Sequence, residues 1–369
     1  MPPLKGLINS FLLISLLFSG GCWDVEEVEK KSFISIIGID STPDDRLLLT
    51  LQIPNCGALV PGGKETQQKL FRTIATTART TLEACTDLEA KTSDTIDTGQ
   101  TKVVIFGRNV VEKGIIPYLD CLGRFPKVNP QTYLVMADLE AGPLLKMEVS
   151  QAILPGLFLM DFFSKDSKKG LSIPIQLWQF LQRMDNPAID PYLPVIYYEP
   201  DEQTFLITGI AAFHHDRLAL TLTPDETKIF GLLSGCTENA SFVFPWSENR
   251  KVGFNFLKTK VKYIWNESDT IQIRVKAEGY FLEDTGKTEP ITDKKLDRYE
   301  KIITRNLERQ ANRLIQKLQQ ANTDILGLGR AVRAKKYGKW SDSWWRSKYP
   351  QLNIHVQVEF KLSRSGRIA

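Results

Sequence analysis

Apolar and polar positions follow different patterns in the two halves of the chain. Up to about residue 200, short apolar runs rich in β-branched residues alternate with segments whose apolar positions recur every three or four residues. The first pattern is typical of strands and the second of helices. We expect strands at 32–40, 46–53, 102–107, 132–137 and 192–198, and helices at 77–90, 110–122, 153–163 and 173–184. This order predicts an α/β layer.

The second half is richer in strands. We expect strands at 205–213, 217–222, 241–244, 251–258, 261–265 and 270–281, with a short helix at 224–233. The helix begins with proline, which the first helical turn tolerates. The later strands alternate apolar and polar residues, which is typical of an antiparallel sheet with one face in water.

A long helix is expected at residues 293–320, with Asp293 as its N-cap. Its apolar positions would form one seam against a sheet, and they are Leu296, Tyr299, Ile303, Leu307, Ala311, Leu314, Leu318 and Ala321. Gly327 and Gly329 interrupt the turn that follows. Residues 352–362 alternate regularly and predict a final strand.

The first 21 residues have the layout of a secretory signal peptide. Lys5 supplies a positive charge, residues 7–18 are largely apolar, and small residues lead to Cys22. As a helix, the apolar segment would reach about 18 Å, whereas a bilayer core is about 30 Å thick. The segment is therefore too short for a comfortable permanent span.

The cysteine at the end of this segment changes its interpretation. A thiolate is suited to thioether formation with a diacylglyceryl donor, and two or more acyl chains anchor a protein firmly. We expect a cleaved lipoprotein signal peptide at 1–21 and lipidation of Cys22, with the mature chain on the outer face of a bacterial membrane. Ser19 stands where lipoprotein signals usually carry leucine, and the alternative is an ordinary signal peptide followed by a chance cysteine.

Composition and charge narrow the function classes. The net charge of +4 gives only weak support for a polyanionic partner, and we expect no nucleic-acid binding. Cys56, Cys85, Cys121 and Cys236 could pair outside the cytoplasm in several connectivities, or serve as small buried apolar residues. Their wide spacing argues against a zinc site.

Several short motifs together resemble the Ger(x)C family of spore germination lipoproteins. The motifs are residues 22–29, 37–40, 102–107, 114–120, 209–213 and 324–329, then Trp340, Trp344, Trp345, Tyr349 and Pro350, and finally 356–358. Each motif is short, but their order and spacing are specific. They run from Cys22 almost to the end of the chain.

The resemblance implies an α+β fold of three mixed α/β domains, built on mainly antiparallel sheets with packed helices. The expected division is 1–21 for the signal peptide, 22–199 for an N-terminal α/β domain with the lipid tether, 200–268 for a small middle β-rich domain, and 269–369 for a C-terminal domain with the long helix and terminal strand. It also implies the C subunit of a nutrient germinant receptor in the spore inner membrane, beside integral membrane A and B subunits.

Three groups of residues carry candidate chemistry of their own. His214 and His215 are adjacent, and neighbouring strand residues point to opposite faces, so we interpret them as turn residues rather than metal ligands. His355 lies within the final strand. A basic run comprises Arg330, Arg333, Lys335, Lys336 and Lys339. We interpret this run as a solvated helix face, with contact to anionic headgroups as the alternative.

The third group is the tryptophan cluster Trp340, Trp344 and Trp345. We interpret it as core packing, and a partner-binding patch is the alternative. We expect no catalytic, cofactor or metal site, since no nucleophile elbow, P-loop or His-Glu-x-x-His motif occurs.

The function hypothesis is a lipid-anchored, non-catalytic receptor subunit that supports assembly or signal relay. The alternative is an extracytoplasmic solute-binding lipoprotein that captures a nutrient directly. That alternative predicts a deep cleft between two similar lobes.

Overall fold

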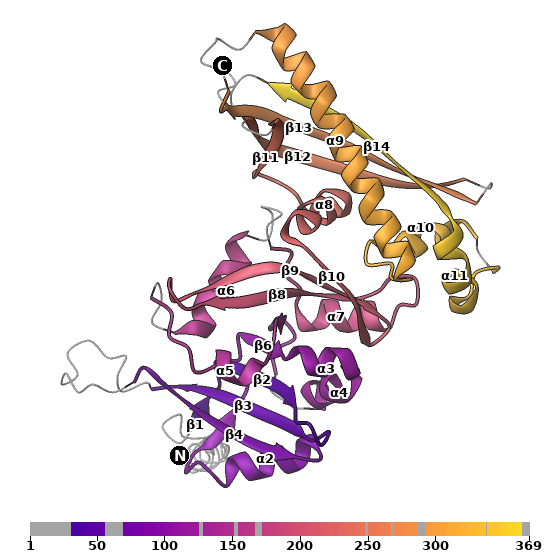
Figure 1. Ribbon diagram of the computed structural model, residues 1–369. Coiled ribbons are helices and arrows are strands. Elements are labelled where there is room, and N and C mark those ends of the chain that lie inside the picture. Colours follow the sequence, from indigo (N-terminus) through magenta and orange to yellow (C-terminus); the bar gives the residue numbers. More distant parts are fainter. Residues whose placement is uncertain are drawn as a thin grey trace, which may run out of the picture.

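The computed structural model describes residues 31–55, 69–124, 128–150, 154–166, 172–247, 250–266, 269–286, 292–336 and 338–363. The expectations for the signal peptide, Cys22 and Cys56 lie outside these residues, as does the side chain of Cys121. The described chain forms an elongated molecule with an eight-stranded and a four-stranded sheet. The amino-terminal strands lie at one end and the four-stranded sheet at the other (Figure 1).

The eight-stranded sheet has the order β10-β9-β8-β7-β6-β2-β3-β4. Its strands are β2 (Ile36–Ser41), β3 (Leu47–Pro54), β4 (Phe71–Ala78), β6 (Val103–Phe106), β7 (Tyr133–Ala137), β8 (Tyr192–Glu199), β9 (Thr204–His214) and β10 (Arg217–Leu222). The central strands β2, β6, β7 and β8 are parallel, and antiparallel hairpins extend both sides. The centre is almost wholly apolar because helices cover both of its faces. A separate parallel pair joins β1 (Lys31–Phe33) to β5 (Thr95–Asp97).

Helices bury the two faces of this sheet in two apolar clusters. They are α2 (Thr81–Glu89), α3 (Arg108–Lys113), α4 (Ile116–Arg124), α5 (Ala141–Leu144), α6 (Pro155–Asp166), α7 (Leu177–Met184) and α8 (Pro224–Ser234). Phe163 of α6 packs on one face with Ile105, whereas Phe180 of α7 lies in the cluster on the other. That second cluster continues into the four-stranded sheet, so one apolar core joins the two sheets.

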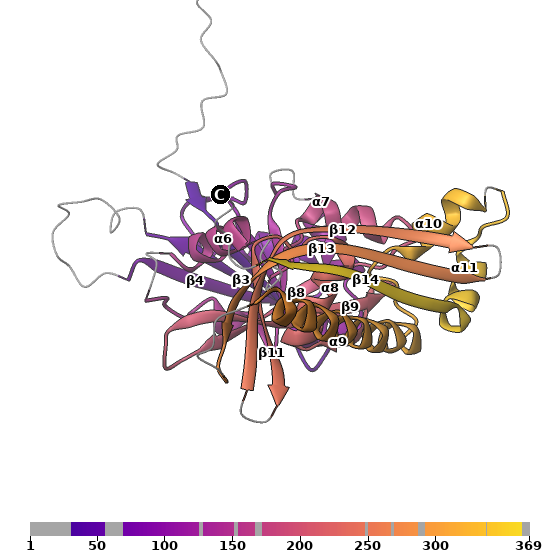
Figure 2. The ribbon, with the colours of Figure 1, turned by 90° about the horizontal axis from the view of Figure 1, so that it is seen from above.

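The four-stranded sheet has the order β11-β12-β13-β14. Its strands are β11 (Ala240–Ser247), β12 (Arg250–Asn266), β13 (Thr270–Asp284) and β14 (Asn353–Ser363). The helix α9 (Asp293–Gln320) lies across one face of the sheet and is followed by α10 (Leu328–Lys335), α11 (Asp342–Lys348) and the 3₁₀ turn η3 (Tyr349–Gln351). Figure 2 shows α9 running lengthwise beside the strands from another side.

Side chains of α9 also satisfy the outer edge of β14. The backbone N–H of Val356 donates to Asn312 Oδ1 (3.2 Å), and that of Val358 donates to Glu308 Oε1 (3.0 Å). A row of unpaired N–H groups on an edge strand is a template for pairing with another chain. These contacts close part of that edge.

Two expectations about the first half are corrected. The helix expected at 77–90 begins only at Thr81, because the preceding residues form β4. Within α2, Ala84 and Leu88 are buried, whereas Leu82 is 79% exposed. The helix expected at 110–122 is divided into α3 and α4 at Gly114, which has φ of 129°. That conformation favours glycine and ends the first helix.

Two expectations about the second half are also corrected. The strands expected at 251–258 and 261–265 are one strand, β12, with an irregularity between Phe256 and Lys258. The N-cap of α9 is Thr292 rather than Asp293. The strands from β11 to β13 pair antiparallel as expected, and the last strand adds a parallel pair beside β13. A parallel pair needs a long crossover, and the helices α9 to α11 supply it.

The α+β fold class is confirmed. The three-domain division stays a prediction, and its inner boundaries fall between strands that pair with each other, β8 with β9 and β12 with β13. Across the residues that the structure describes, none of the helices combines the length and the apolar character that crossing a membrane requires.

The apolar seam of α9 gives a stability prediction. Leu307 is fully buried against the four-stranded sheet, so Leu307→Ala removes packing and leaves a cavity. We expect the free energy of unfolding to fall by about 2–5 kcal/mol, measured by urea titration with circular dichroism. Arg305→Ala, an exposed position on the same helix, is the control and should change it by less than about 0.5 kcal/mol. Equal effects of the two variants would contradict the packing of α9.

Candidate functional site

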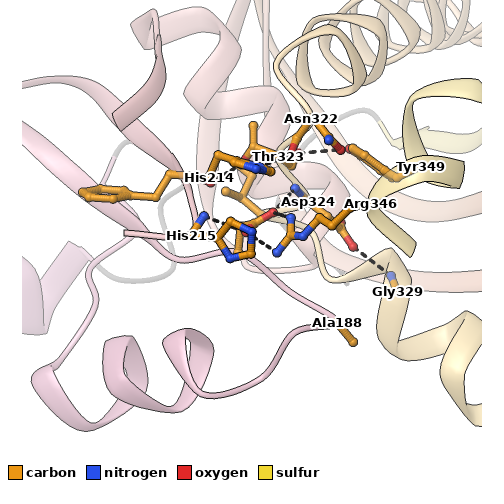
Figure 3. Close-up of polar contacts among 12 residues, drawn as sticks. Ala188, His214, His215, Asn322, Thr323, Asp324, Gly329, Arg346 and Tyr349 are labelled. Carbon is orange, nitrogen blue, oxygen red and sulfur yellow. Dashed lines mark hydrogen bonds and ion pairs between the residues drawn. The ribbon is translucent and has the colours of Figure 1, made fainter. Parts of the chain in front are cut away.

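A buried polar cluster lies where the C-terminal helices meet the eight-stranded sheet (Figure 3). Asp190 comes from the segment that leads into β8, and Asp324 from the turn between α9 and α10. Arg346 projects from α11, and His215 lies in the β9–β10 turn. We call these four residues and Tyr349 the junction cluster. It joins segments that are more than 100 residues apart along the chain.

The centre of the junction cluster is a bidentate ion pair. Arg346 Nη1 donates to Asp190 Oδ2 (2.6 Å), and Nη2 donates to Asp190 Oδ1 (2.8 Å). The Asp190 side chain is 1% exposed and that of Arg346 is 13% exposed. Burial disfavours the charged guanidinium, but the hydrogen bonds and charge of Asp190 outweigh burial and raise the pKa of Arg346. Each charged group therefore depends on the other, because a buried charge without a partner is strongly unfavourable.

Asp190 and Asp324 are also joined through the backbone. The N–H of Asp324 donates to Asp190 Oδ2 (2.6 Å), and the N–H of Asp190 donates to the carbonyl oxygen of Asp324 (2.9 Å). These reciprocal bonds fix the turn after α9 against the strand β8. Arg183 of α7 adds a brace, since its Nη1 donates to the carbonyl oxygens of Asp190 (3.1 Å) and Ile325 (3.0 Å).

The Asp324 carboxyl group accepts hydrogen bonds from the first backbone N–H groups of α10. Its Oδ1 accepts from the N–H of Leu328 (2.9 Å) and its Oδ2 from the N–H of Gly329 (2.8 Å). These N–H groups have no partner within the helix. Burial raises the pKa of Asp324 to about 7; the backbone hydrogen bonds oppose this rise, and the charge of Asp190 adds to it.

The geometry of the chain explains why positions 327 and 329 of the motif 324–329 are both glycine. Gly327 has φ of 74°, a left-handed conformation that favours glycine. At Gly329, a Cβ atom would lie 2.8 Å from the carbonyl oxygen of Ala188 and 2.8 Å from the ring of Trp345. Only glycine lets α10 approach both the backbone before β8 and α11. The expectation that these glycines interrupt a helix therefore becomes more specific: they permit close packing at the junction.

Aromatic residues cover the junction cluster. Trp345 and Tyr349 are fully buried, and their ring centroids are 5.3 Å apart. The Tyr349 hydroxyl donates to the carbonyl oxygen of Thr323 (3.1 Å), and the Thr323 hydroxyl donates to that of Phe213 in β9. The interpretation of Trp345 as core packing is confirmed. Trp340 and Trp344 are partly buried against the same core.

Two cations of the basic run lie over tryptophan rings, while the other three, Arg330, Lys335 and Lys339, are exposed. Lys336 Nζ lies 4.4 Å from the centroid of Trp344 and 5.4 Å from that of Trp265 in β12. The Arg333 guanidinium lies 5.2 Å from the centroid of Trp340. Cations over aromatic faces are attracted by the ring quadrupole. These two cations therefore help to hold α10 and α11 together, a role that the charge pattern alone did not indicate.

The histidines take structural positions. His214 Nδ1 lies 2.6 Å from the carbonyl oxygen of Asn322, and the backbone N–H of His215 donates to Asp190 Oδ1 (3.4 Å). His215 has φ of 55°, as expected for a turn residue. His355 is exposed on β14. Within the described ranges, no group of three or more His, Cys, Asp or Glu side chains is placed to hold a metal ion.

Two of the other motifs meet at a second buried carboxyl group. Asp40, at the end of the motif 37–40, accepts from the N–H groups of Ala141 (2.8 Å) and Gly142 (2.7 Å) at the start of α5. Burial raises the pKa of Asp40 although these hydrogen bonds oppose the rise. Gly107, at the end of the motif 102–107, lies against the Asp40 carboxyl group, where a Cβ atom would collide with it. The amino-terminal motifs therefore also specify close packing.

Two cavities are relevant to ligand binding. One of about 720 Å³ lies by β1, β3 and β4, with Lys31, Lys69, Arg72 and Lys146 among its lining residues. Its volume is within the range of small-molecule sites, and Asn55 is also among its lining residues. A cavity of about 150 Å³ lies beside the Asp190–Arg346 pair. Of the cysteines, Cys85 is half-buried and Cys236 is exposed, and their pairing stays open.

Sequence reasoning found only part of the junction cluster. The motif matches included Asp324, Gly329, Trp345 and Tyr349, but not Asp190 or Arg346. Asp190 stands in a short loop after Ala188 and Ile189, where a solvated aspartate is the ordinary expectation. The sequence signal for Arg346 was weak: it directly follows the motif residue Trp345, and Lys348 is a second cation in the same short helix. Its partner could not be identified without the fold.

Two family models match the chain in succession. The first is described as the spore germination protein N-terminal domain and covers residues 24–198. The second is described as spore germination B3/GerAC like, C-terminal, and covers residues 208–366. The matches meet near the β8–β9 turn, so together they include both sides of the junction cluster.

Whole-chain relatives agree with these models. The chain is 26% identical over 364 residues to spore germination protein GerQC of Bacillus cereus, covering 96% of this chain and 98% of that protein. It is 24% identical over 379 residues to spore germination protein B3 of Bacillus subtilis (strain 168), covering 99% and 98%. The crystal structure of the GerBC protein matches with a TM-score of 0.57 at 19% identity, covering 92% of this chain and 99% of that chain.

The central ion pair predicts a double-mutant signature. Arg346→Met keeps the aliphatic stem but leaves Asp190 buried without its cation, so we expect about 3–5 kcal/mol of destabilisation. In Asp190→Asn/Arg346→Met the buried charge is gone, and we expect the loss to be clearly smaller than the sum of the single losses. Urea unfolding of wild type, Asp190→Asn, Arg346→Met and the double variant measures this coupling. If the two single losses simply added up to the loss of the double variant, the coupling would be contradicted.

The Asp324 carboxyl group predicts a pH dependence. Its pKa rises from an ordinary 3.8 to about 7 on folding, so between these values the native state holds a proton that the unfolded chain releases. Stability should therefore fall as pH rises from about 4 to about 7. Asp324→Asn should flatten this part of the stability profile, whereas Asp201→Asn, in an exposed turn, should not. Identical profiles for wild type and Asp324→Asn would contradict the raised pKa.

Proposed function

The chain belongs to the GerAC family of spore germination proteins, and from this membership we propose that it is the lipid-anchored, non-catalytic C subunit of a nutrient germinant receptor. The observation that carries the proposal is that the two family models follow one another across almost the whole chain. Spore germination is therefore the process in which this protein acts. The subunit role, the anchor and the partners are the proposed refinements.

The proposed anchor is a diacylglyceryl group on Cys22, after cleavage of residues 1–21. Support comes from the apolar segment, the small residues before the cysteine and the short distance to the first strand. Lys31, where β1 begins, lies only nine positions after Cys22. Even fully extended, that tether would span about 30 Å. The folded chain would therefore stay close to the outer face of the spore inner membrane.

The proposed partners are the integral membrane A and B subunits of the receptor. Anchoring in one membrane raises the effective concentration of the partners, so modest contacts are enough for assembly. Nutrient recognition would then occur mainly in a membrane subunit, while this chain supports assembly or relays the signal. A relay needs a body that moves as a unit, and the junction cluster supports this by coupling the two sheets through buried contacts.

A non-catalytic role agrees with the chemistry of the junction cluster. Its carboxylates are occupied by Arg346 and by backbone N–H groups, so they are not arranged as a nucleophile and base around an open site. The cluster holds segments together, and we assign it a structural role within the receptor subunit.

Direct nutrient binding is the second candidate function, because the cavity of about 720 Å³ is large enough for a small molecule. The two sheets differ in strand number and order, unlike the similar lobes of a solute-capturing protein. Titration calorimetry of the full chain in detergent with amino acids and sugars distinguishes the candidates. The receptor-subunit proposal predicts no binding heat in the absence of partner subunits, whereas saturable heat would favour direct capture.

The anchor proposal predicts a clear effect of Cys22→Ala. The variant lacks the sulfur that carries the lipid, so it should move from the membrane fraction to the released fraction and spores should respond poorly to nutrients. Mass spectrometry of the wild-type amino terminus should find fatty acids on Cys22. Cys236→Ala, which removes an exposed cysteine far along the chain, is the control and should remain in the membrane fraction. Normal germination of Cys22→Ala spores would contradict the anchor.

A further inference from the structure

The face of the four-stranded sheet opposite α9 carries a concentration of positive charge. Its outward side chains include six cations and two carboxylates, which we call the cationic face: Lys258, Lys260, Lys262, Arg274, Lys276, Lys361, Glu278 and Glu359. Six cations and two carboxylates give these eight side chains a summed charge of +4. The face is therefore a locally positive surface of the described chain.

The register of the strands places like charges side by side. Lys260 lies directly opposite Lys276, and Lys262 lies directly opposite Arg274. Like charges directly opposite each other on neighbouring strands destabilise a sheet. Lys276 has an ion pair with Glu359 (2.8 Å), but none is found for Lys258, Lys260 or Lys262 among the described residues. Lys258 and Lys361 each lie opposite Glu278, so the pairs that sheet stability does not explain are Lys260 with Lys276 and Lys262 with Arg274.

The cationic face is available to a partner. The alternate residues of β12 point to the other side, where the Tyr263 hydroxyl donates to the carbonyl oxygen of Leu233 in α8 (2.8 Å). In β14 the residues on the α9 side are buried and those on the cationic side are exposed. Since α9 side chains satisfy part of the β14 edge, a partner would contact the side chains of the face rather than add a strand there.

We propose that the cationic face docks an acidic surface of a protein partner. The eight-stranded sheet separates this face from β1, where the proposed lipid tether enters (Figure 1). Strands lie about 4.8 Å apart, so crossing that sheet takes roughly 34 Å. The potential of anionic headgroups is screened within about 8 Å at physiological ionic strength. A protein that stands beside the tethered chain reaches this face more readily than headgroups do.

This inference rests on the proposed function, because the partner is sought among integral receptor subunits. The test is copurification of the tagged full chain with those subunits from detergent extracts of membranes that contain all of them. Lys260→Glu/Lys262→Glu should retain at least about fivefold less of the subunits than wild type. The double variant should fold normally, because each glutamate lies opposite a cation, Lys276 or Arg274, and replaces a repulsive pair.

The control Lys294→Glu/Lys301→Glu makes the same charge change at exposed positions of α9 and should retain the subunits like wild type. If wild type retains them and the cationic-face variant retains as much, this inference is overturned while the proposed function stands. If wild type retains none, both are overturned.

Lipid occupancy is tested separately, with the full chain alone in vesicles. If the face binds a protein rather than lipid, it stays exposed to solvent in vesicles that lack the partner subunits. Amine-reactive labelling should then modify Lys260 and Lys262 equally in phosphatidylglycerol and phosphatidylcholine vesicles. Protection of these lysines in phosphatidylglycerol vesicles would show that anionic headgroups cover the face, and would overturn the protein-docking inference.

Discussion

The bidentate ion pair between Asp190 and Arg346 links the two sheets at a place from which water is largely excluded. A buried ion pair adds little net stability by itself, but losing either partner leaves an uncompensated charge. The pair therefore acts as a constraint on arrangement. It requires the loop before β8, the turn after α9 and the helix α11 to meet in one geometry, and Asp324 extends this geometry to the start of α10.

Close packing follows from the same constraint. Gly329 brings α10 against Ala188 and Trp345, and Tyr349 covers the turn at Thr323. The apolar core is continuous between the sheets, so polar and apolar contacts favour the same arrangement. A protein with this construction would transmit a force or displacement from one end to the other. Two bodies joined by a flexible linker would not.

Much of the fold follows from local patterns in the sequence. The seam of α9 and the alternation of β14 were predicted closely, because both depend on periodic burial that a single segment displays. The elements and pairings that were not predicted depend on residues far away along the chain. β4 was missed because it is the edge strand before a helix, and the parallel pairing of β14 depends on a crossover that no local pattern reveals. Motif resemblance found Asp324 and Gly329, but the partners Asp190 and Ala188 lie more than 130 residues away.

The central claim is that the junction makes the two sheets of this spore germination protein one cooperative body. Hydrogen-exchange mass spectrometry across a urea series tests it most directly, by following peptides from β6 and β7 together with peptides from β12 and β13. The account predicts one shared midpoint at which both sheets lose protection. Two well-separated midpoints, with one sheet intact after the other has opened, would contradict it.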